Sequence, residues 1–247
     1  MSTYNPQFRL PYTLTRAQDN TLTLRVYLDG GASLVVFDSA TVSVYDHQGV
    51  AIIADAVATV AVGGVVTYAI SAATLPTTLA LSEGWQVKWT CTLDGVESHF
   101  TNMAMLVLSQ IHPTLAWGDL TSLHSGLVKL LPAGSTAFTE PLARAWEQIF
   151  RKLLRNGRLP HLILSPYDLT DVHEALTLAL IFNDLETYSM GKGKFAEMAT
   201  KYEERFEKLW EDLHFTFYDG DQDGLPEGEA AARGPVILTC GPIRRWW

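Results

Sequence analysis

The spacing of the hydrophobic residues changes once along the chain, near residue 130. Before this point apolar and polar residues alternate, as in Thr21–Leu28 and Gly84–Leu93, and a period of two is typical of half-buried strands. After it apolar residues recur at steps of three and four, as from Leu142 to Leu153, which is the period of an amphipathic helix. The 247 residues suffice for two modest domains. The pattern therefore predicts a multi-domain α+β chain, with strands first and helices second.

The first domain, residues 1–110, is expected to be an immunoglobulin-like β-sandwich. Turn signals such as Gly63-Gly64 and Asp94-Gly95 separate short alternating runs, and regular spacing of such turns is typical of this fold. Trp85 and Trp89 share the apolar face of one strand. We therefore expect both indoles in the core rather than on a sugar-stacking surface.

Residues 138–229 are expected to form a helical bundle, after a connector over residues 111–137 and before an extended C-terminal tail, residues 230–247. Helix starts are predicted at Thr139-Glu140-Pro141 and at Ser165-Pro166, where proline occupies a position that favours a helix N-terminus. The helix after Pro166 is apolar almost all round, so it is predicted to lie at the centre of the bundle.

A third helix, after Gly193, is predicted to bury one face and expose the other. Its apolar residues recur at helical spacing, which indicates core packing rather than the wall of a cofactor site. The remaining positions include the carboxylates Glu203, Glu204, Glu207, Glu211 and Asp212. Pairs of such groups can act in acid–base catalysis, but a solvated helix face is the commoner outcome and is the prediction here.

An aspartate-rich segment near the C-terminus is the one metal-like motif in the sequence. Asp219, Asp221 and Asp223 alternate and are followed by Gly224, which matches the first half of a calcium-binding loop. The second half departs from the pattern, because Ala230 stands where a bidentate glutamate is needed, and Glu227 is the candidate fourth ligand. Calcium binding and an Asx-rich turn that holds its own backbone both stay open.

Charge is distributed unevenly over the helical half. From Arg144 to Arg158 there are five basic residues and one acid, whereas Glu197 to Glu229 holds eleven acids and three bases. The candidate partner-binding residues of the basic segment are Arg144, Arg151, Arg155 and Arg158. Oppositely charged surfaces suit head-to-tail contact between copies, although two solvated surfaces would give the same composition.

The chain ends in Arg244, Arg245, Trp246 and Trp247, which are further candidate partner-binding residues. A terminal aromatic pair indicates an anchor in a partner's groove, and a tail folded back on its own helices is the alternative.

The sequence predicts no enzyme and no bound organic cofactor. It has no nucleophile elbow, phosphate loop, dinucleotide fingerprint or zinc-type His/Cys spacing. The net charge of −9 argues against sequence-specific nucleic-acid binding. Only Cys91 and Cys240 are present, so we expect no disulfide framework. A reducing compartment is expected for the same reason. The N-terminus lacks the pattern of a secretory signal, and glycines and Pro76 interrupt the longest uncharged run, so no membrane contact is expected.

Four segments in this order resemble the adaptor, or head-completion, proteins that connect head and tail in tailed bacteriophages. The segments are Ala143-Arg144-Ala145-Trp146, Arg155–Leu164, Leu178-Ala179-Leu180-Ile181-Phe182, and Phe217–Gly224. The resemblance covers residues 111–229. The β-rich first half departs from the minimal helical adaptor.

This resemblance implies a structural virion protein, made in the host cytoplasm and located in the neck of the particle. It implies a homo-oligomeric ring, a dodecamer, that binds the portal protein on one side and a tail or neck protein on the other, with DNA passing through the ring. It also implies a C-terminal extension that reaches a neighbouring ring. The alternative function is a carbohydrate-binding or carbohydrate-active protein with the β-sandwich as its sugar module.

Overall fold

The computed structural model describes residues 4–8, 10–28, 35–61, 64–188, 193 and 195–218. Strands precede helices along these residues, which confirms the α+β class. The strands are β1 (Tyr4–Pro6), β2 (Tyr12–Thr15), β3 (Asn20–Leu28), β4 (Ser39–Tyr45), β5 (Ala51–Val57), β6 (Thr59–Ala61), β7 (Val65–Ile70), β8 (Ser82–Leu93) and β9 (Val96–Val107). The α-helices are α1 (Trp117–Leu123), α2 (Thr139–Arg155), α3 (Thr170–Tyr188) and α4 (Ala196–Glu211). Short 3-10 helices are η1 (Ala72–Thr74), η2 (Ser125–Leu130), η3 (Pro160–Leu162) and η4 (Pro166–Leu169).

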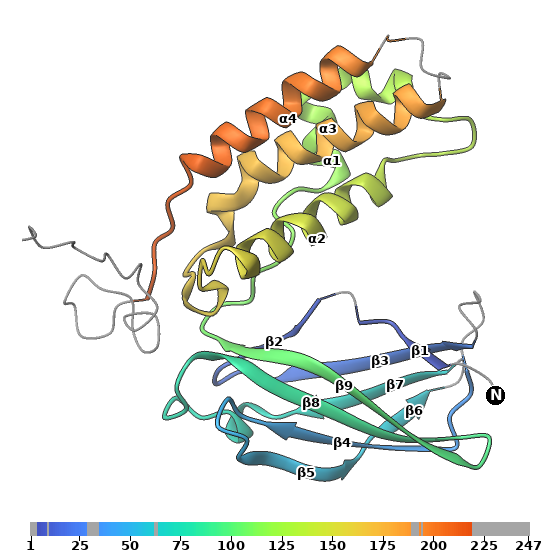
Figure 1. Ribbon diagram of the computed structural model, residues 1–247, viewed down its shortest axis with the longest axis vertical. Helices are drawn as coiled ribbons and strands as arrows, with labels where there is room; N and C mark the ends of the chain where they lie inside the picture. Colours follow the sequence, from blue (N-terminus) through green and yellow to red (C-terminus); the bar gives the residue numbers. More distant parts are fainter. Residues whose placement is uncertain are drawn as a thin grey trace, which may run out of the picture.

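The strands form two sheets that share one hydrophobic core. The four-stranded sheet has the order β1-β3-β7-β6, and the five-stranded sheet has the order β2-β9-β8-β4-β5. Neighbouring strands are antiparallel except β2 and β9, which are parallel. Leu24 and Val66 from one sheet and Val42 and Trp89 from the other belong to the same buried cluster. The strands thus form one unit, here called the β lobe (Figure 1).

The alternating pattern predicts the buried faces of β3 and β8 well. Trp85 and Trp89 are 1% and 0% exposed, as expected from their shared face. The indole nitrogen of Trp85 donates to Ser82 Oγ at 2.9 Å. The alternation of Thr21–Leu28 would place Leu28 on the buried face with Leu22, Leu24 and Val26, but this is wrong for Leu28, which lies at the end of β3 and is 40% exposed.

The helices form a second unit, here called the helical lobe, which lies beside the five-stranded sheet (Figure 1). The helix α3 contacts both α2 and α4 and is buried along most of its length, as its continuous apolar sequence predicts. Proline at the third position of α2 and the Ser165-Pro166 start before η4 lie at the expected helix beginnings. No helix among the described residues is both long enough and apolar enough to span a membrane.

Residues 159–164, here called the clasp, connect the cores of the two lobes. Leu162 is buried in the core of the β lobe, and its neighbour Ile163 is buried in the core of the helical lobe. The segment after α4 pairs with it: Tyr218 N donates to Leu162 O at 2.9 Å, and Leu164 N donates to Thr216 O at 3.1 Å. Met105 of β9 also packs into the helical core. Packing therefore crosses the expected boundary at residue 110.

Candidate protein–protein interface

A groove runs between α2 and α4. Its floor includes Leu176 of α3, which lies between the two helices. It consists of two overlapping hollows of about 530 and 640 Å³ that share Gln148, Leu176, Phe206 and Glu207. Leu176 of α3 and Phe206 of α4 are buried and lie beneath it. We call this the α2–α4 groove.

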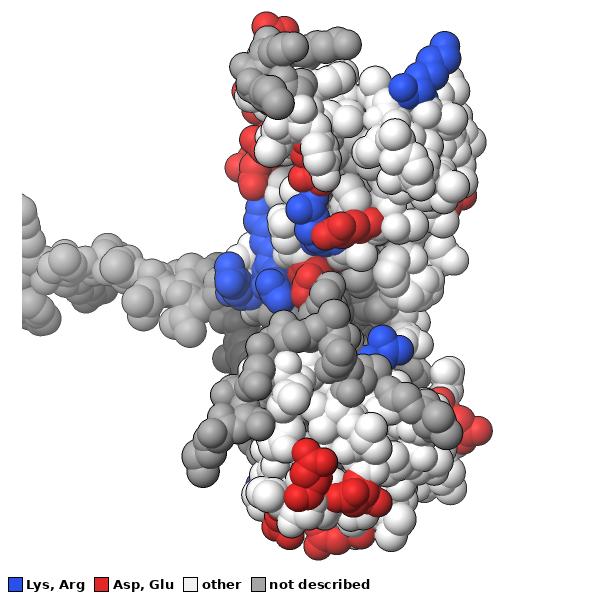
Figure 2. Space-filling model, turned by 90° about the vertical axis from the view of Figure 1, so that its right-hand side faces the viewer, with Lys and Arg blue, Asp and Glu red and all other residues white. Residues whose placement is uncertain are grey.

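The banks of the groove carry opposite charge. The α2 bank presents Arg151, Lys152 and Arg155. The α4 bank presents four glutamates, Glu203, Glu204, Glu207 and Glu211, and one lysine, Lys208. Figure 2 shows Lys and Arg side chains beside Asp and Glu side chains along one edge of the helical lobe. The sequence predicts oppositely charged surfaces; the structure places both on one groove instead of on separate faces.

Amphipathic patterning explains this placement. Both helices bury their apolar stripes against α3, so that the charged residues are turned toward solvent. Ala145, Ile149 and Leu153 are fully buried on α2, and Phe206 and Trp210 are buried on α4. The two charged faces meet because both helices pack on the same partner. The expectation of a solvated face for the glutamates of α4 is confirmed.

Lys152 bridges the groove. Its Nζ lies 2.6 Å from Glu207 Oε2 and 4.5 and 4.9 Å from the ring centroids of Phe206 and Trp210. An ammonium held over two aromatic faces beside a carboxylate gains both cation–π and ionic attraction. This contact fixes α2 and α4 relative to each other, while the charges on either side of it face solvent.

The four arginines singled out from the sequence have different roles. Arg144 pairs with Asp184 of α3, and Arg151 Nη2 lies 2.9 Å from Glu147 Oε1. Arg158 Nη1 donates to the carbonyl of Leu213 at 2.7 Å, where a cation balances the negative end of α4. Arg155 is exposed and has no hydrogen bond or ion pair within the described residues. Of the four, Arg155 is the one available to another chain.

The remaining predicted site residues lie outside the described residues. These are the calcium candidates Asp219, Asp221, Asp223 and Glu227, and the terminal candidates Arg244, Arg245, Trp246 and Trp247. Within the part of the chain that the structure describes, no three His, Cys, Asp or Glu residues are grouped so as to hold a metal ion.

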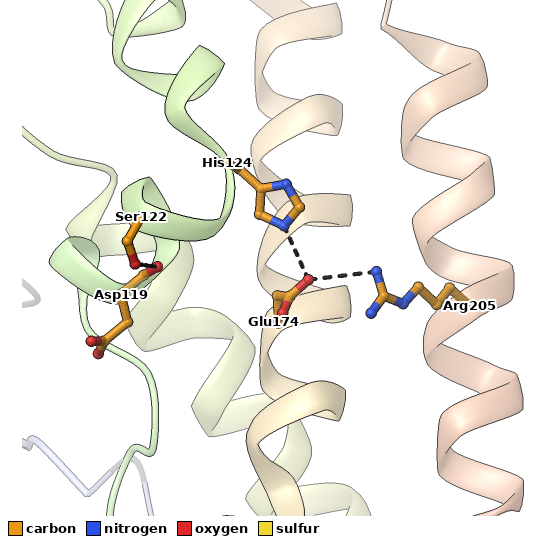
Figure 3. Close-up of polar contacts among 5 residues, drawn as sticks. All are labelled: Asp119, Ser122, His124, Glu174 and Arg205. Carbon is orange, nitrogen blue, oxygen red and sulfur yellow. Dashed lines mark hydrogen bonds and ion pairs between the residues drawn. The ribbon is translucent and has the colours of Figure 1, made fainter.

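A buried carboxylate joins three elements of the helical lobe (Figure 3). Glu174 of α3 is 7% exposed. Its Oε1 lies 3.0 Å from His124 Nε2, at the end of α1, and 3.5 Å from Nη1 of Arg205 on α4. A buried carboxylate needs such partners to offset its lost hydration. No local pattern predicts this network, because His124 and Arg205 lie 50 and 31 positions from Glu174.

The contacts of Glu174 attach α3 to α4 and to the end of α1. Ser122, drawn beside Asp119 on α1 in Figure 3, donates to the backbone carbonyl of Asp119 at 2.7 Å and so is turned toward its own helix. Cys91 is a buried free thiol in the β lobe, and burial raises its pKa to about 12. A thiol of that pKa is a poor nucleophile near neutral pH.

A second, more apolar hollow of about 510 Å³ lies between η2 and the helices α3 and α4. Leu127, Leu178, Phe182 and Tyr202 are among its lining residues. Leu123, among its lining residues, is 60% exposed.

Comparison with known proteins does not assign the chain to a family. No protein-family model and no curated protein matches it. One solved structure that it matches is an engineered protein, with 17% identity and a TM-score of 0.30. That match covers 44% of this chain and 20% of the engineered one, and a likeness at this level carries no argument about fold or function.

Proposed function

We propose that the protein is a structural component of a virion, the head-to-tail adaptor of a tailed phage, which forms a homo-oligomeric ring between portal and tail. The observation that carries the proposal is the α2–α4 groove. The groove is lined by charged side chains that have no partner among the described residues. These are Arg155 on one bank and Glu204 and Glu211 on the other. Unpaired charge beside a hollow supports binding of another protein surface.

The order of the elements supports the same function. The resemblance to phage adaptors rests on segments that now fall on α2, on the clasp at 159–164, on α3 and on the segment after α4. We assign the two sheets of the β lobe to an immunoglobulin-like sandwich and the helices to a bundle centred on α3. The shared core of the sheets and the contacts of α3 with both neighbours support these assignments.

The burial of Trp85 and Trp89 disfavours the alternative, a carbohydrate-binding protein. A sugar-binding module exposes aromatic rings for stacking, whereas these indoles are 1% and 0% exposed. A glycan-binding screen of the purified chain is expected to be negative. Saturable binding to a defined glycan would favour the alternative.

Quantitative mass spectrometry of purified virus particles tests the adaptor function. The chain is expected in a fixed ratio close to that of the portal subunit, because stacked rings of one neck have related copy numbers. Absence of the chain from intact particles would reject the proposal. A ratio far above that of the portal would instead indicate a component of the shell or tail tube.

A further inference from the structure

The charge pattern of the α2–α4 groove is self-complementary, and this follows from the directions of the two helices. Lys152 of α2 pairs with Glu207 of α4, and Arg158 bonds to Leu213. Both pairs are separated by 55 positions, so α2 and α4 run in the same direction, as Figure 1 shows. By this offset Arg155 lies level with Trp210, and so within one residue of Glu211, which lies on the opposite bank.

A twofold axis along the groove exchanges the banks. It places the basic α2 bank of a second copy over the acidic α4 bank of the first, at the same height along the helices, and the reverse contact forms by symmetry. Arg155 of each copy then faces Glu211 of the other. Both residues are exposed and have no partner within the described residues, so the contact needs no internal ion pair to break.

We propose that the free chain forms a twofold dimer through the α2–α4 groove, with Arg155 of each copy pairing with Glu211 of the other. The inference concerns the free chain in solution, away from any ring, and there a second copy occupies the groove. It does not depend on the adaptor function. The two are separable, because particle composition tests one and the mass of the free chain tests the other.

The size of the surface indicates a weak, salt-sensitive dimer. The helix α2 has 17 residues and is therefore about 25 Å long. With neighbouring helices about 9 Å apart, the face from α2 to α4 covers roughly 500 Å² per copy, and two such faces reach the lower limit of specific interfaces. Exposed ion pairs also weaken as salt increases. The dimer is thus expected to dissociate on dilution and at high salt.

Light scattering after size-exclusion chromatography of the full chain tests the dimer. We expect twice the mass of one chain at low salt and the mass of one chain at high salt. Arg155→Glu and Glu211→Arg are each expected to weaken the dimer at least tenfold, because either change puts like charges opposite each other. Mixing the two variants restores attraction at both contacts, so the mixture is expected to give a dimer again. Lys129→Glu, an equal charge change at an exposed site off the groove, serves as the control.

Three outcomes would overturn the inference. The first is a monomer at low salt and high protein concentration. The second is a dimer that Arg155→Glu leaves intact, because the contact then lies elsewhere. The third is a mass well above two chains, since head-to-tail contacts build rings whereas a twofold contact stops at two. Circular dichroism of each variant separates lost association from lost folding.

Discussion

At the scale of single residues, His173 is a buried base held neutral by its surroundings. It lies on α3 with no exposed surface, with its Nε2 3.1 Å from the carbonyl of Leu142 and its ring packed 5.4 Å from that of Trp146. Burial lowers its pKa, and the hydrogen bond to Leu142 opposes that shift only in part. The ring therefore resists protonation while the protein is folded.

This burial predicts a loss of stability at acid pH that depends on His173. Its pKa is lower in the folded than in the unfolded state, where it is about 6.5, so the unfolded chain binds the proton more readily. The contribution of the neutral His173 ring to the free energy of unfolding is fully present above its pKa in the unfolded chain. This contribution decreases as the pH falls below that pKa. One unit below that pKa, at about pH 5.5, the loss reaches at most about 1.4 kcal/mol.

Urea denaturation near pH 7.5 and 5.5 checks this prediction. His173→Leu is expected to flatten the dependence of the unfolding free energy on pH, whereas His112→Gln, at an exposed position, is expected to leave it unchanged. Equal pH dependence in the wild type and His173→Leu would show that the ring is not the source of acid sensitivity.

At the scale of elements, the clasp at residues 159–164 joins two packing units. Leu162 and Ile163 are adjacent and fully buried, yet they belong to different cores. The 3-10 turn η3 makes this possible because it points successive side chains in different directions. The backbone is held on both sides, by Leu108 N, just after β9, which donates to His161 O, and by the bridge between Ile163 and Phe217.

Truncation of Leu162 should therefore destabilise the β lobe, although Leu162 belongs to none of its strands. Leu162→Ala leaves a cavity in that core and is expected to cost about 2–5 kcal/mol of unfolding free energy. Leu164→Ala, two residues on at a partly exposed site, is the matched control and is expected to cost far less. Chemical denaturation of both variants gives the comparison, and equal losses would contradict the assignment of Leu162 to the core.

The network at Glu174 predicts a second element-scale effect. Glu174→Gln removes the charge that His124 and Arg205 share, and we expect a loss of about 1–3 kcal/mol. Glu204→Gln on the exposed face of α4 is expected to be neutral within error. Hydrogen exchange should show faster exchange in α1 of the Glu174→Gln variant, whereas unchanged exchange there would mean that the network does not hold α1 in place.

The sequence predicted elements better than contacts. Period-two and helical spacing locate β3, β8 and the three long helices, because these patterns reflect one buried face each. The strands β1 and β2 were missed since three or four residues carry no readable period. The partners of Glu174 and the split roles of Leu162 and Ile163 depend on how distant segments meet, which a single sequence does not encode locally. The sequence shows the charges of the groove, but their shared location follows from the packing of both helices on α3.

At the scale of the whole molecule, the two lobes are built to unfold together. The helical core takes Met105 and Val107 from β9, and the β core takes Leu162 from the helical side. Neither lobe can lose its structure without exposing buried residues of the other. Cores that share residues in this way couple their stability.

Scanning calorimetry of the full chain tests this coupling. A single transition is expected, because partial unfolding would leave apolar side chains of the clasp exposed. The calorimetric and van't Hoff enthalpies should then agree. Leu162→Ala should lower the midpoint temperature of this transition, which should remain a single peak. Two resolved transitions in the wild type would mean that the lobes are independent domains that meet at residue 110, and that the clasp contributes little to either.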